Sequence, residues 1–94
     1  MFHVYILSSE PQSTLYVGST DNLLGRVWQH KNRAVPGFAA EHQVDRLVWF
    51  EAHETRESVL SRERQIKEWK RAWKIELIEQ ANPVWVDLYG GLAG

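Results

Sequence analysis

Two short segments with alternating side chains constrain the fold of this chain most strongly. Residues 2–8 and residues 14–20 each repeat with a period of two, with apolar side chains at alternate positions. That period is typical of β-strands. Only residues 9–13, which include Pro11, separate the two segments. Because parallel strands need a long crossover, so short a connection predicts an antiparallel hairpin.

The rest of the chain is predicted to form one further strand and three helices. The strand is expected at residues 46–52, which are rich in Val, Trp and Phe. The helices are predicted over residues 23 to about 33, from a cap at Thr55 to about Trp69, and from near Lys70 to Asn82. The order strand, strand, helix, strand, helix, helix predicts an α/β (α+β) fold. It would be a three-stranded antiparallel sheet flanked by helices.

All 94 residues are expected to form a single domain. Its compact core would span about residues 1–81, followed by a tail over residues 82–94. Trp85 is expected to hold the tail on the body of the domain. The Gly-rich residues 90–94 are expected to fray.

The buried side chains are expected on one face of each helix. In the first helix these are Leu23, Leu24, Val27 and Trp28. In the second helix they are Val59, Leu60 and Ile66. Aromatic residues at helical spacing usually pack in a core. The same is therefore expected of the tryptophans at positions 28, 49, 69 and 73.

Charge is balanced over the whole chain but uneven along it. The formal net charge is −1, which argues against a polybasic nucleic-acid coat protein. Residues 22–40 contain basic residues and no acid, and residues 62–74 contain six basic residues and two acids. Such stretches are either solvated helix faces or surfaces that track a phosphate backbone. From composition alone, solvated faces are the better explanation.

Several classes of protein are excluded by what the sequence lacks. The chain has no cysteine, which excludes a disulfide framework and a thiolate zinc site. It has no apolar stretch near the ~20 residues that span a bilayer, and its N-terminus lacks the basic lead-in of a secretion signal. We therefore expect a cytoplasmic protein with no membrane partner.

Glu63 is the first candidate for a functional site. Helical spacing places it on an apolar stripe with Val59 and Ile66. A carboxylate in that position loses hydration and must be paired, hydrogen-bonded or bound to a cation. On spacing alone, a structural ion pair is the better explanation, because such pairs also occupy these positions.

Two further groups of residues could carry chemistry. Arg26 and His30 lie one helical turn apart, so an arginine that can hold a phosphate and a histidine that can move a proton share one face. Tyr5 and Tyr16 lie on neighbouring strands, and Gly18 follows two residues later. Glycine weakens a strand unless a backbone or a ligand must come close. Arg26 and His30 are also explained as exposed polar residues on a surface helix, and the two tyrosines as packing residues of the strands.

Together these residues resemble the GIY-YIG nuclease superfamily. Val4-Tyr5-Ile6 stands where the family has its GIY element, and Tyr16-Val17-Gly18 stands where it has YIG. Arg26 and His30 match the Arg and His that the family carries on a helix. Glu63 matches its metal-binding glutamate.

The resemblance covers nearly the whole chain. Residues 62–69 and 82–88 look like the small, stand-alone bacterial branch of the superfamily. The chain departs from the family pattern at two places. Val4 replaces a glycine, and residues 38–42 replace a segment that commonly contains a Thr and a Tyr. The second departure would alter substrate preference.

The resemblance implies metal-dependent hydrolysis of phosphodiester bonds. Glu63 would hold one Mg²⁺ or Mn²⁺ ion, and Mg²⁺ needs only one or two protein carboxylates because it keeps several waters. Tyr16 would act as general base or proton relay, assisted by His30. Arg26 would stabilise the charge that grows on the phosphate. Tyr5 would complete the hydrogen-bond frame.

Four further residues are implied to bind the substrate. Gly18 would let the backbone approach the phosphate, and Asn82 is similar to an asparagine that supports the family's site. Lys31 and Lys67 lie in the two basic stretches and would contact the nucleic acid.

The leading functional prediction is therefore a nuclease that acts on DNA, or on RNA, in DNA repair or nucleic-acid processing. The alternative is a nucleic-acid-binding module of nuclease descent with weak or no catalysis. A protein-interaction domain is a third possibility that the near-neutral charge leaves open. Target choice would come from the small fold itself, from a homodimer or from a protein partner.

Overall fold

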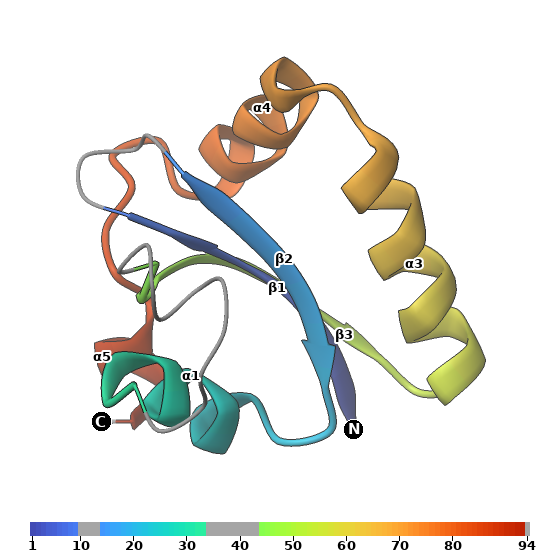
Figure 1. Cartoon of the computed structure of the whole chain (residues 1–94), viewed down its shortest axis with the longest axis horizontal. Helices are drawn as coiled ribbons and strands as arrows, with labels where there is room; N and C mark the ends of the chain where they lie inside the picture. The colour runs from blue at the N-terminus through green and yellow to red at the C-terminus, as the bar shows by residue number, and fades with distance from the viewer. Residues whose placement is uncertain (10–13, 34–43, 94) are drawn as a thin grey trace.

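Three strands form the sheet in this computed structural model, which describes residues 1–9, 14–33 and 44–93 (Figure 1). They are β1 (Phe2–Ser8), β2 (Leu15–Thr20) and β3 (Arg46–His53), in the spatial order β2-β1-β3. Both outer strands run antiparallel to β1, as the sequence predicts. Most of the predicted turn at residues 9–13 and the family departure at residues 38–42 lie outside the described residues.

The helices differ in how clearly the sequence marks where they begin and end. In the described part of the chain they are α1 (Leu23–Lys31), α3 (Arg56–Glu68), α4 (Arg71–Ala81) and α5 (Tyr89–Ala93). Asn22 and Thr55 cap α1 and α3, and their side chains accept backbone hydrogen bonds at 3.0 and 3.1 Å. Extended backbone at Trp69 and Lys70 separates α3 from α4, at the predicted break.

Each face of the sheet has its own apolar core. α3 and α4 lie on one face, and α1 and α5 lie on the other (Figure 1). The core under α3 and α4 consists of Val4, Ile6, Val17, Val48, Trp49, Val59, Ile66, Ile78 and Trp85. The core under α1 and α5 consists of Tyr5, Leu7, Leu23, Val27, Val44 and Leu47. Alternation along β1 explains the division, because successive strand residues point to opposite faces. The predicted fold class and element order are confirmed.

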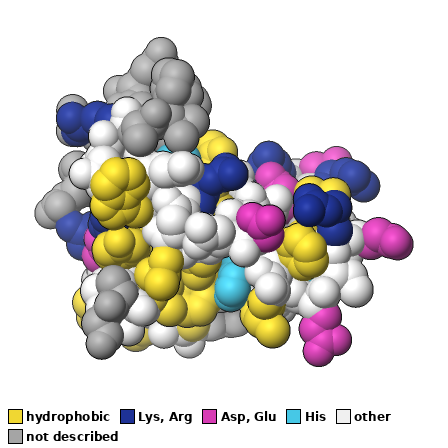
Figure 2. All heavy atoms as spheres, turned by 90° about the horizontal axis from the view of Figure 1, so that it is seen from below, with side chains coloured by type: hydrophobic (Ala, Val, Ile, Leu, Met, Phe, Trp, Pro, Cys, Tyr) yellow, Lys and Arg dark blue, Asp and Glu magenta, His cyan; other side chains and the backbone are white. Residues whose placement is uncertain are grey.

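Four of the side chains expected in the core are exposed. The exposed fractions are 42% for Leu24, 52% for Trp28, 42% for Leu60 and 53% for Trp73. In α1 the buried positions are Leu23, Val27 and His30, which form one narrow stripe and leave the neighbouring positions outside it. Figure 2 shows apolar side chains gathered at the surface on the side of α1 and α5. The expectation for Trp49 is confirmed, since it is buried, and Trp69 is partly buried.

The expectation that the Gly-rich end frays is wrong for the described residues. Residues 89–93 form α5, which contacts α1. The partly buried side chains of Leu88, Tyr89 and Leu92 pack against the core on that face of the sheet. The backbone N–H of Leu88 donates to the carbonyl of Leu47 at 2.8 Å and so ties the tail to β3. Trp85 is buried, as expected of a residue that holds the tail in place.

Candidate active site

Three ring side chains gather on the face of the sheet that α1 covers. Tyr5 lies on the central strand, Tyr16 on β2, and His30 in the last turn of α1. Their ring centroids lie 5.4 Å apart for Tyr16 and His30, 6.1 Å for Tyr5 and His30, and 6.3 Å for the two tyrosines. The Tyr5 hydroxyl oxygen lies 3.3 Å from His30 Nε2. The structure therefore brings three of the predicted site residues together.

Gly18 makes room for this cluster. It pairs directly with Tyr5 across the β1–β2 ladder. A Cβ atom at Gly18 would lie 2.6 Å from the Tyr5 hydroxyl oxygen and 3.0 Å from Tyr16 Cε2. The glycine is thus explained by the close approach of a tyrosine ring, whereas the sequence pointed to the approach of a phosphate.

We expect Gly18→Ala to destabilise the domain by about 1–3 kcal/mol, because the fully buried Tyr5 ring has no space to move away from the new methyl group. Urea unfolding followed by far-UV circular dichroism measures the change. Gly91→Ala is the matched control, since a Cβ there meets nothing within 4 Å. Equal stability of the two variants would show that Gly18 is not under this constraint.

Burial sets the protonation states of Tyr5 and His30. Burial raises the pKa of the Tyr5 hydroxyl far above its ordinary value, and the nearby Tyr16 raises it further. Arg26, through its positive charge and its hydrogen bond to that hydroxyl, acts in the opposite direction but is outweighed. Burial, and then the charge of Arg26, lower the pKa of His30. At neutral pH, Tyr5 therefore keeps its proton and His30 is neutral and able to accept one.

Glu63 reaches the edge strand β2 from the opposite face of the sheet. Its Oε1 accepts a hydrogen bond from Ser19 Oγ at 2.5 Å, and Lys67 Nζ lies 2.8 Å from its Oε2. The Glu63 side chain is 16% exposed. The ion pair that spacing alone favoured is therefore present, with Lys67 as the partner. Lys67 itself is 53% exposed, so it remains accessible to a ligand.

The candidate site consists of the ring cluster on one face of the sheet and Glu63 on the other, and both contact the edge strand β2. Tyr16 and Gly18 point to the α1 face, and Ser19 points to the α3 face, because adjacent strand residues alternate. The negative charge of Glu63 contributes to the raised pKa of Tyr5, so the carboxylate and the ring cluster interact electrostatically. Arg26 is partly exposed and interacts with both Tyr5 and His30.

Ser19 was not among the residues singled out from the sequence. An isolated serine has no motif of its own, and its importance depends on which helix covers its face. The available signal was its position, because it alternates with Val17 and therefore shares the face on which Glu63 lies.

The carboxylate of Glu63 at this edge suits a magnesium ion that has few protein ligands and keeps most of its waters. Within residues 1–9, 14–33 and 44–93, no group of three or more His, Asp or Glu residues could hold a metal. Glu63 is one partly buried carboxylate at the sheet edge. Because Mg²⁺ keeps several waters and needs only one or two carboxylates, this donor set fits it, whereas a zinc site would need more protein ligands.

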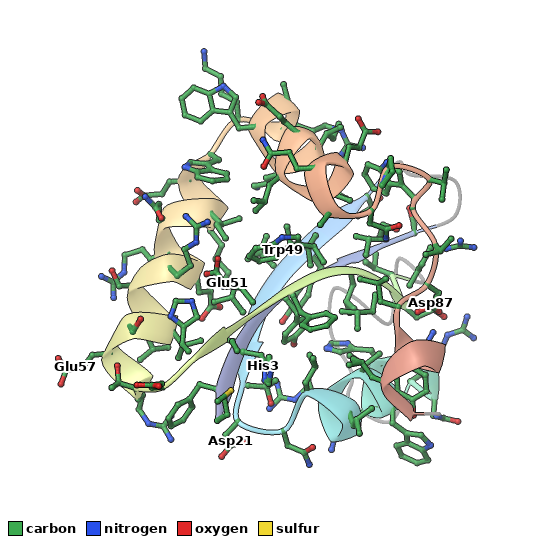
Figure 3. All side chains as sticks on the ribbon, turned by 180° about the vertical axis from the view of Figure 1, so that it is seen from behind. His3, Asp21, Trp49, Glu51, Glu57 and Asp87 are labelled. Carbon is green, nitrogen blue, oxygen red and sulfur yellow. The ribbon has the colours of Figure 1, made fainter. Side chains whose placement is uncertain are left out.

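Two predicted substrate-binding residues, Lys31 and Asn82, contact the C-terminal tail. Lys31 forms an ion pair with Asp87 and lies 5.3 Å from the centroid of the Tyr89 ring. Asp87, labelled in Figure 3, lies where the tail passes β3 and enters α5.

The Asn82 side chain forms hydrogen bonds to the backbone of β3 and of the tail. It is 4% exposed, and its amide nitrogen donates to the carbonyls of Val48 at 3.1 Å and Val86 at 2.9 Å. Its amide oxygen accepts from the Val86 N–H at 3.0 Å. The polar side-chain atoms of Asn82 therefore join the tail to β3.

These features define a class of protein. The sheet order β2-β1-β3, with two tyrosines on adjacent strands, an Arg and a His on α1 and a Glu on α3, matches the family on which the sequence motifs converge. The profile of the GIY-YIG catalytic domain matches residues 1–76. The chain belongs to the GIY-YIG catalytic domain family, a family of nucleases.

Within that family, the chain is similar to small proteins named UPF0213. It is 37% identical to a UPF0213 protein of Clostridium perfringens over 78 residues, which is 83% of each chain. It is 33% identical to one of Haloquadratum walsbyi over 82 residues, covering 87% of this chain and 91% of the relative. The solution NMR structure of a UPF0213 protein from Bacillus halodurans has the same fold, with a TM-score of 0.58, 23% identity and 93% coverage of both chains.

None of the helices in the described ranges is long and apolar enough to cross a bilayer.

Proposed function

We propose that this protein is a metal-dependent nuclease that hydrolyses phosphodiester bonds in DNA or RNA. It would act in DNA repair or nucleic-acid processing. One observation carries the proposal. The Tyr5, Tyr16 and His30 rings lie together beside β2, and the neighbouring Ser19 of that strand donates a hydrogen bond to the partly buried carboxylate of Glu63. Membership of a nuclease family supports the same reaction.

In this proposal each side chain has a distinct role. Glu63 holds one Mg²⁺ or Mn²⁺ ion, which supplies Lewis-acid stabilisation of the phosphate. Arg26 neutralises negative charge that develops on the phosphate oxygens. Tyr16 lies on the edge strand and relays the proton of the attacking water, and neutral His30, whose ring lies 5.4 Å away, assists by accepting it. Tyr5 remains protonated and orients His30.

Cleavage of labelled single-stranded, duplex and branched DNA, and of single-stranded RNA, tests this function. Wild type and Arg26→Ala are each incubated with Mg²⁺, Mn²⁺ or EDTA. Cutting that needs the metal and is lost in Arg26→Ala is the expected result. Binding without cutting on all these substrates would instead favour the nucleic-acid-binding module of nuclease descent.

Ser19 is expected to position the metal ligand. Ser19→Ala removes the 2.5 Å hydrogen bond to Glu63 Oε1 and should reduce the cleavage rate by about 10- to 100-fold, as is typical for groups that orient a metal ligand. The rate at several Mg²⁺ concentrations measures this effect, because a poorly oriented ligand also raises the Mg²⁺ requirement. Ser61→Ala, at an exposed position on α3, is the control. An unchanged Mg²⁺ requirement in Ser19→Ala would argue against the role.

A further inference from the structure

The corner between α3 and α4 carries two neighbouring tryptophans, the partly buried Trp69 and the exposed Trp73. Trp69 ends α3 and Trp73 lies in the first turn of α4. Their ring centroids lie 6.2 Å apart with an interplanar angle of 80°. Trp73 is 53% exposed, although large aromatic side chains normally contribute to a core. The catalytic site does not explain this exposure.

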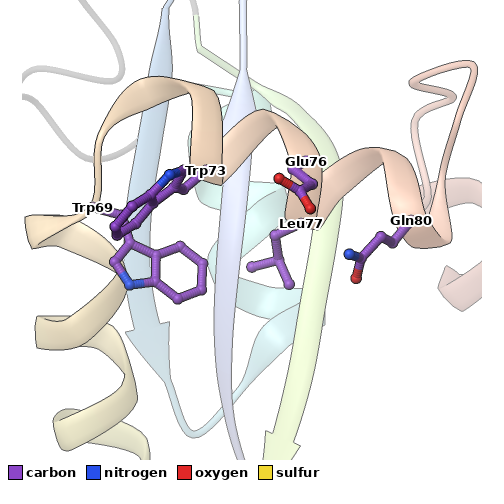
Figure 4. A pocket seen from close by; sticks show the side chains of 5 residues that line it. All are labelled: Trp69, Trp73, Glu76, Leu77 and Gln80. Atoms are coloured by element: carbon purple, nitrogen blue, oxygen red, sulfur yellow. The ribbon is translucent and has the colours of Figure 1, made fainter.

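The pair forms one wall of an open hollow of ≈ 350 Å³ (Figure 4). Leu77 provides a further apolar contact, and Glu76 and Gln80 provide polar groups along the same helix. Figure 4 shows the two indole rings at one end of the hollow and Gln80 toward the other. A flat ring with polar edges would therefore meet stacking surfaces at one end and hydrogen-bonding groups at the other.

One cationic side chain lies near each of the two rings. Lys70 Nζ lies 6.0 Å from the centroid of the Trp73 ring, and the guanidinium of Arg62 lies 5.3 Å from that of Trp69. Arg62 also donates to Glu51 and Gln65, which fixes its position. No acidic residue lies in the first turn of α4. Residues 62–74 contain six basic residues against two acids, so the stretch of chain beside the hollow favours a polyanion, while Glu76 lines the hollow itself.

We propose that this hollow binds an unpaired base of a nucleic-acid strand, with the base stacked on Trp73 and the adjacent phosphates on Lys70 and its basic neighbours. Aromatic rings beside cations are the usual means of holding single strands, because every base has a face that can stack. Glu76 accepts a hydrogen bond from an amino group on the edge of the base. A protein segment without acidic side chains would bring no anion to Lys70.

The inference rests on the proposed function, in that the substrate is a nucleic acid, and adds how the substrate is held. Trp69, the residue that ends α3, follows Glu63 by six residues, which corresponds to about 9 Å along the axis of that helix. A base in the hollow would therefore lie within a few nucleotides of the bond that is cut. The preferred substrate would be a strand with at least one unpaired base near the cleavage position.

Binding measured in EDTA tests the proposal without cleavage. Fluorescence anisotropy of a labelled single-stranded oligonucleotide gives the affinity of wild type, Trp73→Ala, Trp73→Phe and Trp28→Ala. Trp28 is the matched control because it is 52% exposed on α1, away from the hollow. We expect Trp73→Ala to lose about tenfold in affinity for the single strand, in the range known for one stacked base, and little for a blunt duplex. Trp73→Phe should recover most of the loss, and Trp28→Ala should match wild type.

A second set of binding measurements locates which base of the oligonucleotide occupies the hollow. An abasic site is moved along the oligonucleotide, and wild type should lose affinity at one position, whereas Trp73→Ala should be insensitive to it. Equal affinities of Trp73→Ala and Trp28→Ala would overturn the proposal. So would a loss of self-association in Trp73→Ala with unchanged oligonucleotide binding, because the hollow would then be a contact between two copies. Failure of catalysis alone would show in the cleavage assay and leave these binding results unaffected.

Discussion

Glu63→Gln should cut nucleic acid about 10²–10³-fold more slowly than wild type, the largest effect expected of any single substitution on activity. Glutamine has nearly the same shape but lacks the negative charge that would hold the cation. Ser19 and Lys67, the present partners of the carboxylate, would contact a neutral amide instead. Single-turnover cleavage of the best substrate from the panel, with Mg²⁺ in excess, measures the change.

Two comparisons make that result specific. Glu68→Gln removes an exposed carboxylate from the same helix and should cleave at the wild-type rate. The thermal midpoint of Glu63→Gln should stay close to that of wild type, so a loss of activity would not reflect unfolding. Cleavage by Glu63→Gln within a few-fold of wild type would show that this carboxylate does not hold the metal.

Trp85→Ala is expected to have the largest effect on stability, a loss of about 3–5 kcal/mol. Trp85 is 4% exposed in the core under α3 and α4, and its indole N–H donates to Glu79 Oε2 at 2.8 Å. Domains of this size are stable by only about 5–15 kcal/mol, so the substitution removes a large share of the total. Urea unfolding gives the free energy of each variant.

Neighbouring positions in the tail provide the controls for Trp85. Val84 is 74% exposed, and Val84→Ala should be nearly neutral. Trp85→Phe keeps an aromatic ring but not the N–H, so its loss should fall between the two. A loss in Trp85→Ala no larger than in Val84→Ala would show that the tail does not stabilise the domain.

The strands and the helix boundaries could be predicted because their signals are local. Alternation gave β1 its bounds, and the side-chain cap at Thr55 marked the start of α3. α5 could not be predicted in that way, since Gly90 and Gly91 disfavour a helix. Its stability comes from contacts of Leu88 and Leu92 with the core under α1, which no local pattern reveals.

The candidate site could be predicted only in part. The family motifs identified Tyr5, Tyr16 and His30, which lie together, and Glu63, which lies at the same sheet edge. The partners of each residue depend on tertiary structure. Three features depend on how the helices pack on the sheet and on one another. They are the ion pair of Lys31 with the tail, the hydrogen bonds of the Asn82 amide and the exposure of Trp73.

The most direct test of the metal site is the broadening of backbone amide signals by Mn²⁺ in NMR spectra of the protein bound to a hydrolysis-resistant oligonucleotide. Broadening centred on Ser19, Glu63 and Tyr16 that disappears in Glu63→Gln is the expected result. Broadening centred elsewhere, for instance around Glu51 and His53, or the same pattern in Glu63→Gln, would contradict a catalytic metal at the edge of β2.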